Sequence, residues 1–185
     1  MYQTVKTIFR LFFAGIIFLI TLALFLSVFS KSQEILQADQ AFQQARQISL
    51  TSTPDKQLVL VSNNQRPDQA IYIVIAQNGY IAKLNCQHYL QDICTNEYNQ
   101  SHTRQIQQLE LLKIGQQFYI QQINYKNSLT QKQQQWSYSK PQIEQFYQTD
   151  ISDLKYHLFS MALFALAALY VSIRIIRNFK QFIHG

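Results

Sequence analysis

Residues 8–29 read IFRLFFAGIIFLITLALFLSVF, an apolar run that is interrupted by Arg10 near its start. An α-helix rises about 1.5 Å per residue, so a run of this length crosses the roughly 30 Å hydrocarbon core of a bilayer. The alternative is a secretory signal peptide, because Lys6 and Arg10 would suit its charged start. However, the run is longer than the apolar part of such a signal, and residues 27–31 offer no small-x-small cleavage site. We therefore predict an uncleaved membrane helix over 8–29.

A second apolar run, HLFSMALFALAALYVSIRII, occupies residues 157–176. It is close to the minimum length for a membrane span, and the long side chain of Arg174 can reach the headgroup level. The alternative is a buried helix of a soluble protein. A helix that is apolar all round needs lipid or a large core, and roughly 125 residues between the runs make one small domain. We therefore predict a second membrane helix over 157–176.

The cations beside the two runs predict their orientation. Lys6 and Arg10 lie at the start of the first run, and Arg174, Arg177 and Lys180 lie at the end of the second. The flanks that face the middle of the chain are mixed in charge, so the positive-inside rule places both termini in the cytoplasm. These cations also contribute to the net charge of +6, which favours membrane anchoring over nucleic-acid binding.

The chain between the runs predicts an α+β membrane protein, with two transmembrane helices flanking a small, mainly antiparallel β-domain on helical stalks. Apolar residues at three- and four-residue spacing predict a stalk helix after the first span, before Pro54, and a second one from Pro141 into the second span. The expected order is an N-terminal segment 1–7, span 8–29, stalk 30–50, β-rich domain 51–140, stalk 141–156, span 157–176 and tail 177–185.

The strongest local β-signal is a hairpin. Asn78-Gly79 separates two β-prone runs, residues 70–77 and 80–85, and both turn residues tolerate positive φ. A second β-block covers residues 109–125, with Gly115 as a turn or bulge. Five or six short strands of this kind predict a small antiparallel sheet or half-barrel.

Cys86 and Cys94 are the two cysteines of the chain, and both fall in the part expected outside the cytoplasm. In an oxidising compartment such a pair is closed by a disulfide. Free thiols, or a redox or metal role, are the alternatives. A metal site would recruit His88 and His102, but this spacing matches no compact zinc motif. We predict the disulfide.

Patterns typical of catalytic and cofactor sites are missing from the sequence. It contains no nucleophile elbow, no Walker A motif and no G-x-G-x-x-G. Acidic pairs such as Asp92 with Glu97, and Asp150 with Asp153, are what any solvated surface carries. We predict a non-enzymatic protein with no catalytic residue, no metal and no cofactor.

Ala165, Ala168 and Ser172 put small side chains along one side of the second span. Small residues let helices approach closely, so this side is a candidate contact for another helix and for oligomer formation. Such residues are also common in membrane helices that have no partner.

The layout of anchor, β-domain and anchor, with the element Ile114-Gly115-Gln116-Gln117-Phe118-Tyr119-Ile120, is similar to that of several families of small bacterial envelope proteins. It also resembles the input half of transmembrane sensors, and the likeness assigns no functional residue. We expect a two-pass inner-membrane accessory or subunit protein, whose periplasmic domain binds a protein partner in a cell-envelope complex. The alternatives are an immunity or inhibitor protein against an extracytoplasmic toxin or enzyme, a ligand-sensing module coupled to a separate signalling protein, and a thiol-active protein.

Overall fold

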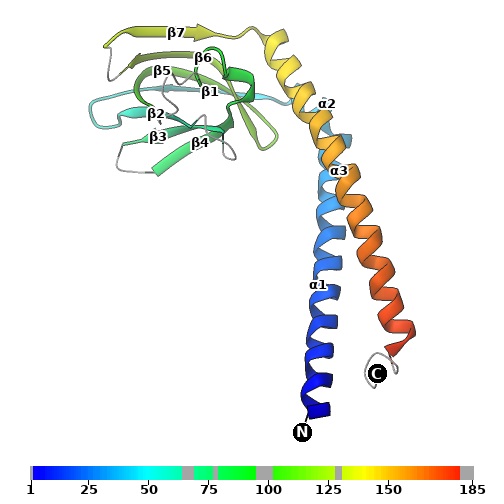
Figure 1. Ribbon diagram of the computed structural model, residues 1–185. Coiled ribbons are helices and arrows are strands. Elements are labelled where there is room, and N and C mark those ends of the chain that lie inside the picture. Colours follow the sequence, from blue (N-terminus) through cyan, green and yellow to red (C-terminus); the bar gives the residue numbers. More distant parts are fainter. Residues whose placement is uncertain (1, 64–68, 77–78, 95–101, 128–130, 180–185) are drawn as a thin grey trace. The chain divides into compact units, whose positions relative to one another are not determined.

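A computed structural model describes residues 2–63, 69–76, 79–94, 102–127 and 131–179 of the chain. The chain divides into two compact units (Figure 1). One is a helical unit of Met1–Ala38 and Thr149–Gly185, and the other is a β-domain of Asp39–Gln148. The fold is therefore α+β, with two long apolar helices flanking an antiparallel β-sheet domain, as the sequence predicts.

Two long helices make up the helical unit. Helix α1 spans Tyr2–Leu36, and helix α3 spans Lys140–Arg177, of which the part from Thr149 onward belongs to this unit. By length and composition both helices are able to cross a membrane. Their apolar stretches are free of proline and rich in Leu and Ala, which form helices well.

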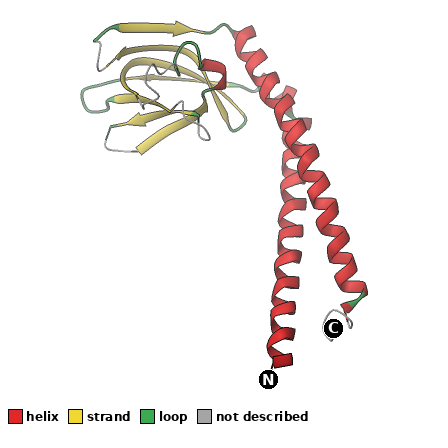
Figure 2. Cartoon of the chain, in the orientation of Figure 1, coloured by secondary structure: helices red, strands yellow, loops and turns green. Residues whose placement is uncertain are grey.

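The β-domain is built on one antiparallel sheet (Figure 2). Its strands are β1 Arg46–Thr51, β2 Leu58–Asn63, β3 Ala70–Ile75, β4 Gly79–Asn85, β5 His102–Ile114, β6 Gln117–Asn127 and β7 Gln133–Ser137. The order is β4-β3-β2-β5-β6-β7, and β1 pairs with β5 beside β2. Strand β5 has 13 residues and is long enough to pair with two strands along one edge. Its residues 102–106 pair with β2, and its residues 108–113 pair with β1.

The sheet curls around its own core, because β4 approaches β6 although three strands separate them in the sheet. Alternate residues of the inner strands point into this core and exclude water, which is the main source of the domain's stability. The most deeply buried side chains include Leu60, Ile71, Ile73, Ile106, Leu109, Leu111, Ile120 and Ile123.

The predicted hairpin is present, since β3 and β4 pair antiparallel with a bulge between Ile73 and Val74. Gly79 has φ +99°, a conformation that glycine adopts without steric cost. Asn78, the other predicted turn residue, lies outside the described residues. At Gly115 the second predicted turn joins β5 to β6, with φ +58°.

The stalk helix predicted over 30–50 is wrong in its last part. Helix α1 ends at Leu36, and a short helix α2 follows over Ala38–Gln43. Residues 46–51 are strand β1, because Ile48 and Leu50 alternate with polar residues and both pair with the long strand β5. The β-domain therefore begins at Asp39, earlier than the predicted residue 51, and ends at Gln148, later than the predicted residue 140.

The start of α3 agrees with the predicted stalk. The side chain of Gln142 caps the start of the helix, because its Oε1 accepts from the Ser139 backbone N–H at 2.8 Å and from the Ser139 hydroxyl at 2.9 Å. Pro141 lies in the first turn, where a missing N–H costs nothing.

Candidate functional site

Helices α1 and α3 pack against each other along a stripe of mostly apolar residues, which includes small side chains and the hydroxyls of Thr21 and Ser172. Non-exposed positions recur at alternating three- and four-residue spacing, the pattern of coiled-coil packing. They are Ala14, Ile17, Thr21, Leu24 and Val28 on α1, and Leu158, Met161, Ala165, Ala168, Ser172 and Ile175 on α3. Within the helical unit the two helices run in opposite directions (Figure 1).

A hydroxyl pair links the two helices within this stripe. Thr21 Oγ1 lies 3.1 Å from Ser172 Oγ, and both residues are buried. Thr21 also donates its single hydroxyl proton to the carbonyl of Ile17, at 2.7 Å. Ser172 is therefore the donor of the interhelical hydrogen bond.

The outward faces of the same helices carry large apolar side chains. On α1 they include Phe9, Phe12, Leu19, Leu22, Leu26 and Phe29, and on α3 Phe159, Leu163, Phe164, Leu166 and Ile173. The contact between the helices thus holds small, aliphatic and hydroxyl side chains, while many bulky Phe and Leu side chains are exposed. An exposed apolar surface of this size is stable when lipid or another protein covers it.

Ala165 and Ser172, predicted as a contact for another helix, are 2% and 3% exposed within the single chain. Together with the partly exposed Ala168 they belong to the stripe that faces α1. A second copy would therefore have to displace α1 to use this side. Of the predicted orienting cations, Lys6 and Arg10 lie on α1, and Arg174 and Arg177 lie in the last turn of α3. Lys180 lies outside the described residues.

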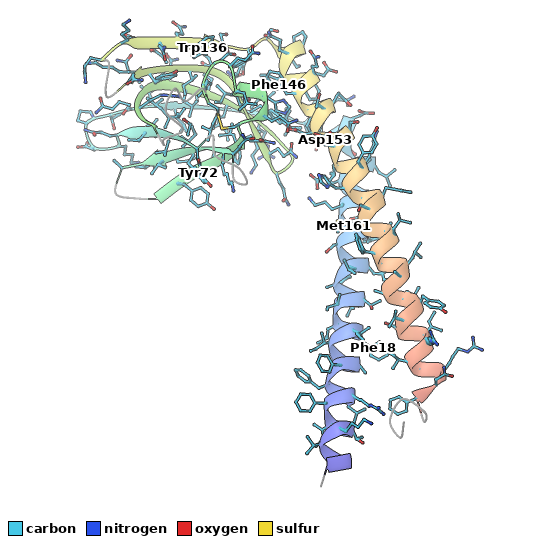
Figure 3. All side chains as sticks on the ribbon, in the orientation of Figure 1. Phe18, Tyr72, Trp136, Phe146, Asp153 and Met161 are labelled. Atoms are coloured by element: carbon cyan, nitrogen blue, oxygen red, sulfur yellow. A yellow bond between two sulfur atoms is a disulfide. The ribbon has the colours of Figure 1, made fainter. Side chains whose placement is uncertain are left out.

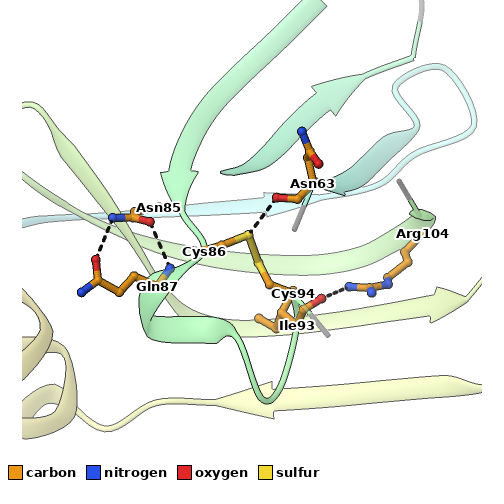
Figure 4. Close-up of a disulfide and its surroundings, with 7 residues drawn as sticks. All are labelled: Asn63, Asn85, Cys86, Gln87, Ile93, Cys94 and Arg104. Carbon is orange, nitrogen blue, oxygen red and sulfur yellow. Dashed lines mark hydrogen bonds between the residues drawn. A yellow bond between two sulfur atoms is a disulfide. The ribbon is translucent and has the colours of Figure 1, made fainter. Parts of the chain in front are cut away.

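In the β-domain, a disulfide closes a short loop after β4 (Figure 4). Cys86 and Cys94 are bonded, with their Cα atoms 5.8 Å apart, and neither is exposed. The loop contains the 3₁₀ helix η1 (Gln87–Tyr89), and the Tyr89 carbonyl accepts from the N–H groups of Ile93 and Cys94 at 2.9 and 2.8 Å. Full burial shields this disulfide from thiol exchange, which is typical of a structural bond.

The metal alternative requires free thiolates, and both sulfurs are used by the disulfide. The His88 ring stacks on Phe146 instead, with centroids 4.6 Å apart. Within the described residues no three His, Cys, Asp or Glu side chains gather as metal ligands. The side chain of His102 lies outside that part.

Aromatic side chains pack the disulfide loop against the first turns of α3. Tyr89 meets Tyr138 edge-on at 5.3 Å and Phe146 at 5.8 Å, and Phe146 lies on α3 (Figure 3). The Tyr89 hydroxyl accepts from the Ile120 N–H of β6 at 2.9 Å. A second chain of rings joins Tyr119 of β6 to Tyr147 of α3, and Tyr147 to Phe42 of α2. These contacts hold α2 and the beginning of α3 on the sheet.

Arg104 of β5 is a buried cation that the sequence analysis did not identify. It is 5% exposed, its Nη1 donates to the Ile93 carbonyl in the disulfide loop, and its guanidinium lies 5.1 Å from the centroid of the Tyr125 ring. Burial lowers the pKa of Arg104, because desolvation disfavours the charged form. The sequence does contain a signal for this burial. Residues two apart in a strand share a face, so Arg104 lies on the same inward face as Ile106.

Tyr138, directly after β7, should make the free energy of unfolding depend on pH in the alkaline range. Burial raises the pKa of Tyr138, and its hydroxyl donates to Asp92 Oδ2 at 2.9 Å, which raises the pKa further. An unfolded tyrosine has a pKa of about 10, so the stabilisation is complete below that pH. It is lost progressively as pH rises above 10, because the unfolded chain releases the proton first.

In urea titrations between pH 8 and 11, we expect Tyr138→Phe to be less stable than the wild type at pH 8 but to lose less stability on the way to pH 11. Tyr80→Phe is the control, since Tyr80 is 72% exposed. Equal slopes for Tyr138→Phe and the wild type would contradict the assignment.

No family model matches the chain, and neither a curated protein nor a solved structure matches it. The class of protein therefore follows from the structure itself, namely an α+β protein with a pair of apolar helices and a disulfide-closed β-domain.

Proposed function

We propose that this chain is a two-pass protein of the inner (plasma) membrane, with α1 and α3 spanning the bilayer. The observation that carries the proposal is the helix pair whose outer surface exposes phenylalanines and leucines, while Thr21 and Ser172 are buried between the helices. In water such a pair would aggregate through its outer face. In hydrocarbon the outer face is solvated by acyl chains, and small residues and hydroxyls provide the contact between helices.

The β-domain is proposed to lie on the extracytoplasmic side. The buried disulfide supports this side, because disulfides persist in oxidising compartments. The cations at the far ends of the helices support it independently through the positive-inside rule.

A reporter fused after Gly185 tests this topology. We expect a fluorescent protein that matures in the cytoplasm to be active there, and alkaline phosphatase, which needs export, to be inactive. Active phosphatase at this position would overturn the proposed orientation. The matched control is the same pair of reporters inserted between Thr53 and Lys56, where the backbone makes an exposed turn and the activities should be reversed.

We further propose that the β-domain acts as a non-enzymatic accessory module that binds a protein partner in an envelope complex. Strand β7 supports this role, because within the described residues it pairs with β6 and has no neighbour on its other edge. Its sequence, QQQWS, is uncharged, and four of its five residues are exposed. Proteins usually protect edge strands with charges, proline or bulges, so an unprotected edge suits the addition of a partner's strand.

Photo-crosslinking in intact cells tests the partner. With a crosslinking residue at Gln135 of β7, we expect one membrane or periplasmic protein to be trapped and identified by mass spectrometry after detergent extraction. The matched control is Tyr80, which is exposed on β4 at the opposite edge of the sheet. A single soluble toxin or enzyme at Gln135 would favour the immunity or inhibitor alternative. The same products from both positions, or none from Gln135, would contradict partner binding through β7.

A further inference from the structure

Two cations, Arg46 of β1 and Lys113 of β5, lie directly opposite each other in the sheet. In an antiparallel pair, directly opposed side chains are close enough to interact, and like charges at such positions are destabilising. Both side chains emerge on the face that carries the next pair of that face, Ile48 and Leu111, each two positions along its strand. The nearest acidic residue along β5, Glu110, opposes Ser49 and therefore belongs to the other face.

Nothing in the described part of the chain neutralises this pair. The ion pair between Lys31 and Glu34 belongs to the helical unit and involves neither of these two cations. Lys113 instead has its Nζ 5.4 Å from the centroid of the Phe118 ring, a contact that orients the ammonium group without cancelling its charge. The sheet thus keeps two positive charges together at a cost in stability.

The same two side chains line a surface hollow of about 300 Å³, with Ala41, Gln44 and Gly115. The hollow has the volume of about ten water molecules, enough for a tetrahedral oxyanion and part of its hydration shell. Ala41 and Gly115 contribute no bulk, and at Gly115 a φ of +58° makes any larger residue strained. The Gln44 amide adds a neutral donor, and none of the described residues that line the hollow is a carboxylate.

We propose that Arg46 and Lys113 form a binding site for a phosphate group. A guanidinium binds two phosphate oxygens at once through its planar fork, and an ammonium group adds a point charge beside it. The bound anion removes the repulsion between the two cations, so binding stabilises the folded domain. The phosphate comes from a phospholipid headgroup or from a soluble phosphate compound. The inference depends on the β-domain alone and stands or falls separately from the proposed partner binding at β7.

The test uses the full chain in a neutral detergent and measures its thermal midpoint with two probes. Inorganic phosphate is compared with sodium chloride at equal ionic strength, and short-chain phosphatidylglycerol is compared with short-chain phosphatidylcholine. We expect phosphate and phosphatidylglycerol to raise the midpoint in a saturable way. In Arg46→Gln/Lys113→Gln we expect the apparent affinity to fall about tenfold or more, because charged hydrogen bonds are lost. Without an anion this variant should be at least as stable as the wild type.

Lys83→Gln is the matched control, because Lys83 also lies over an aromatic ring, that of Tyr72, on another part of the sheet. It should respond to both probes as the wild type does. A response to phosphatidylglycerol alone identifies a lipid headgroup as the source, and a response to both probes identifies the phosphate group itself. If the double variant and the wild type respond equally, or if chloride acts as well as phosphate and neither lipid acts, the site does not exist.

Discussion

Replacing Tyr89 with alanine is expected to destabilise the β-domain by about 3–5 kcal/mol, the usual cost of removing a large buried aromatic ring. Tyr89 is 1% exposed and lies at the centre of the disulfide loop. Its ring packs against Tyr138 and Phe146, and its hydroxyl accepts from the Ile120 N–H. The truncation leaves a cavity between the loop, β6 and the start of α3, and it also leaves a buried N–H without its partner.

Urea unfolding of the full chain in detergent measures this effect, with the fluorescence of Trp136, the single tryptophan, as the signal. Tyr89→Phe keeps the ring and removes the hydroxyl, so we expect a loss of about 1–3 kcal/mol. Tyr80→Ala removes a ring that is 72% exposed and should change stability by about 0.5 kcal/mol or less. If Tyr89→Ala and Tyr80→Ala were equally stable, the aromatic cluster would not be what holds the loop.

Removing the disulfide by Cys86→Ala/Cys94→Ala is expected to cost about 2–3 kcal/mol, the value for a cross-link that closes a short loop. Alanine is the better replacement, because both positions are fully buried and a serine hydroxyl would need a hydrogen-bond partner there. Unfolding midpoints are compared with and without dithiothreitol. The reductant should lower the midpoint of the wild type and leave the cysteine-free variant unchanged.

A wild-type midpoint that does not respond to reductant under unfolding conditions, together with a variant of equal stability, would show that the disulfide contributes nothing. The structure also predicts that the two changes do not add. Tyr89 and the disulfide stabilise the same loop. Once one of them is removed the loop is already less ordered, so removing the other lowers the free energy of unfolding by less. We therefore expect the triple variant to be less destabilised than the sum of the two effects.

The two long apolar helices, the β3–β4 hairpin and the turn at Gly115 were predictable because each depends on neighbouring residues. A helix needs a continuous apolar run of sufficient length, and a tight turn needs a residue that tolerates positive φ, as at Gly79 and Gly115. Cys86 and Cys94 were predictable as a pair for a similar reason, since eight positions of chain already keep them close. In each case the information lies within one short window of sequence.

Strand β1 was not predictable in this way. Residues 46–51 follow the helical spacing of the first stalk without a proline or glycine to end it, and they become a strand because they pair with β5 beside β2. Likewise, the small residues of α3 were visible in the sequence. Which helix they contact depends on the folding of the chain, which brings α3 back alongside α1. Arg104 becomes a buried residue only when the disulfide loop folds over β5.

The apolar runs by themselves thus determine that this chain has two helices able to cross a membrane, because length and composition are local properties. Tertiary pairing alone decides that Thr21 meets Ser172 between the helices, that β7 has one neighbour among the described strands, and that Arg46 meets Lys113. These contacts join residues far apart in the chain, and their formation depends on the folding of the whole unit rather than on any local periodicity.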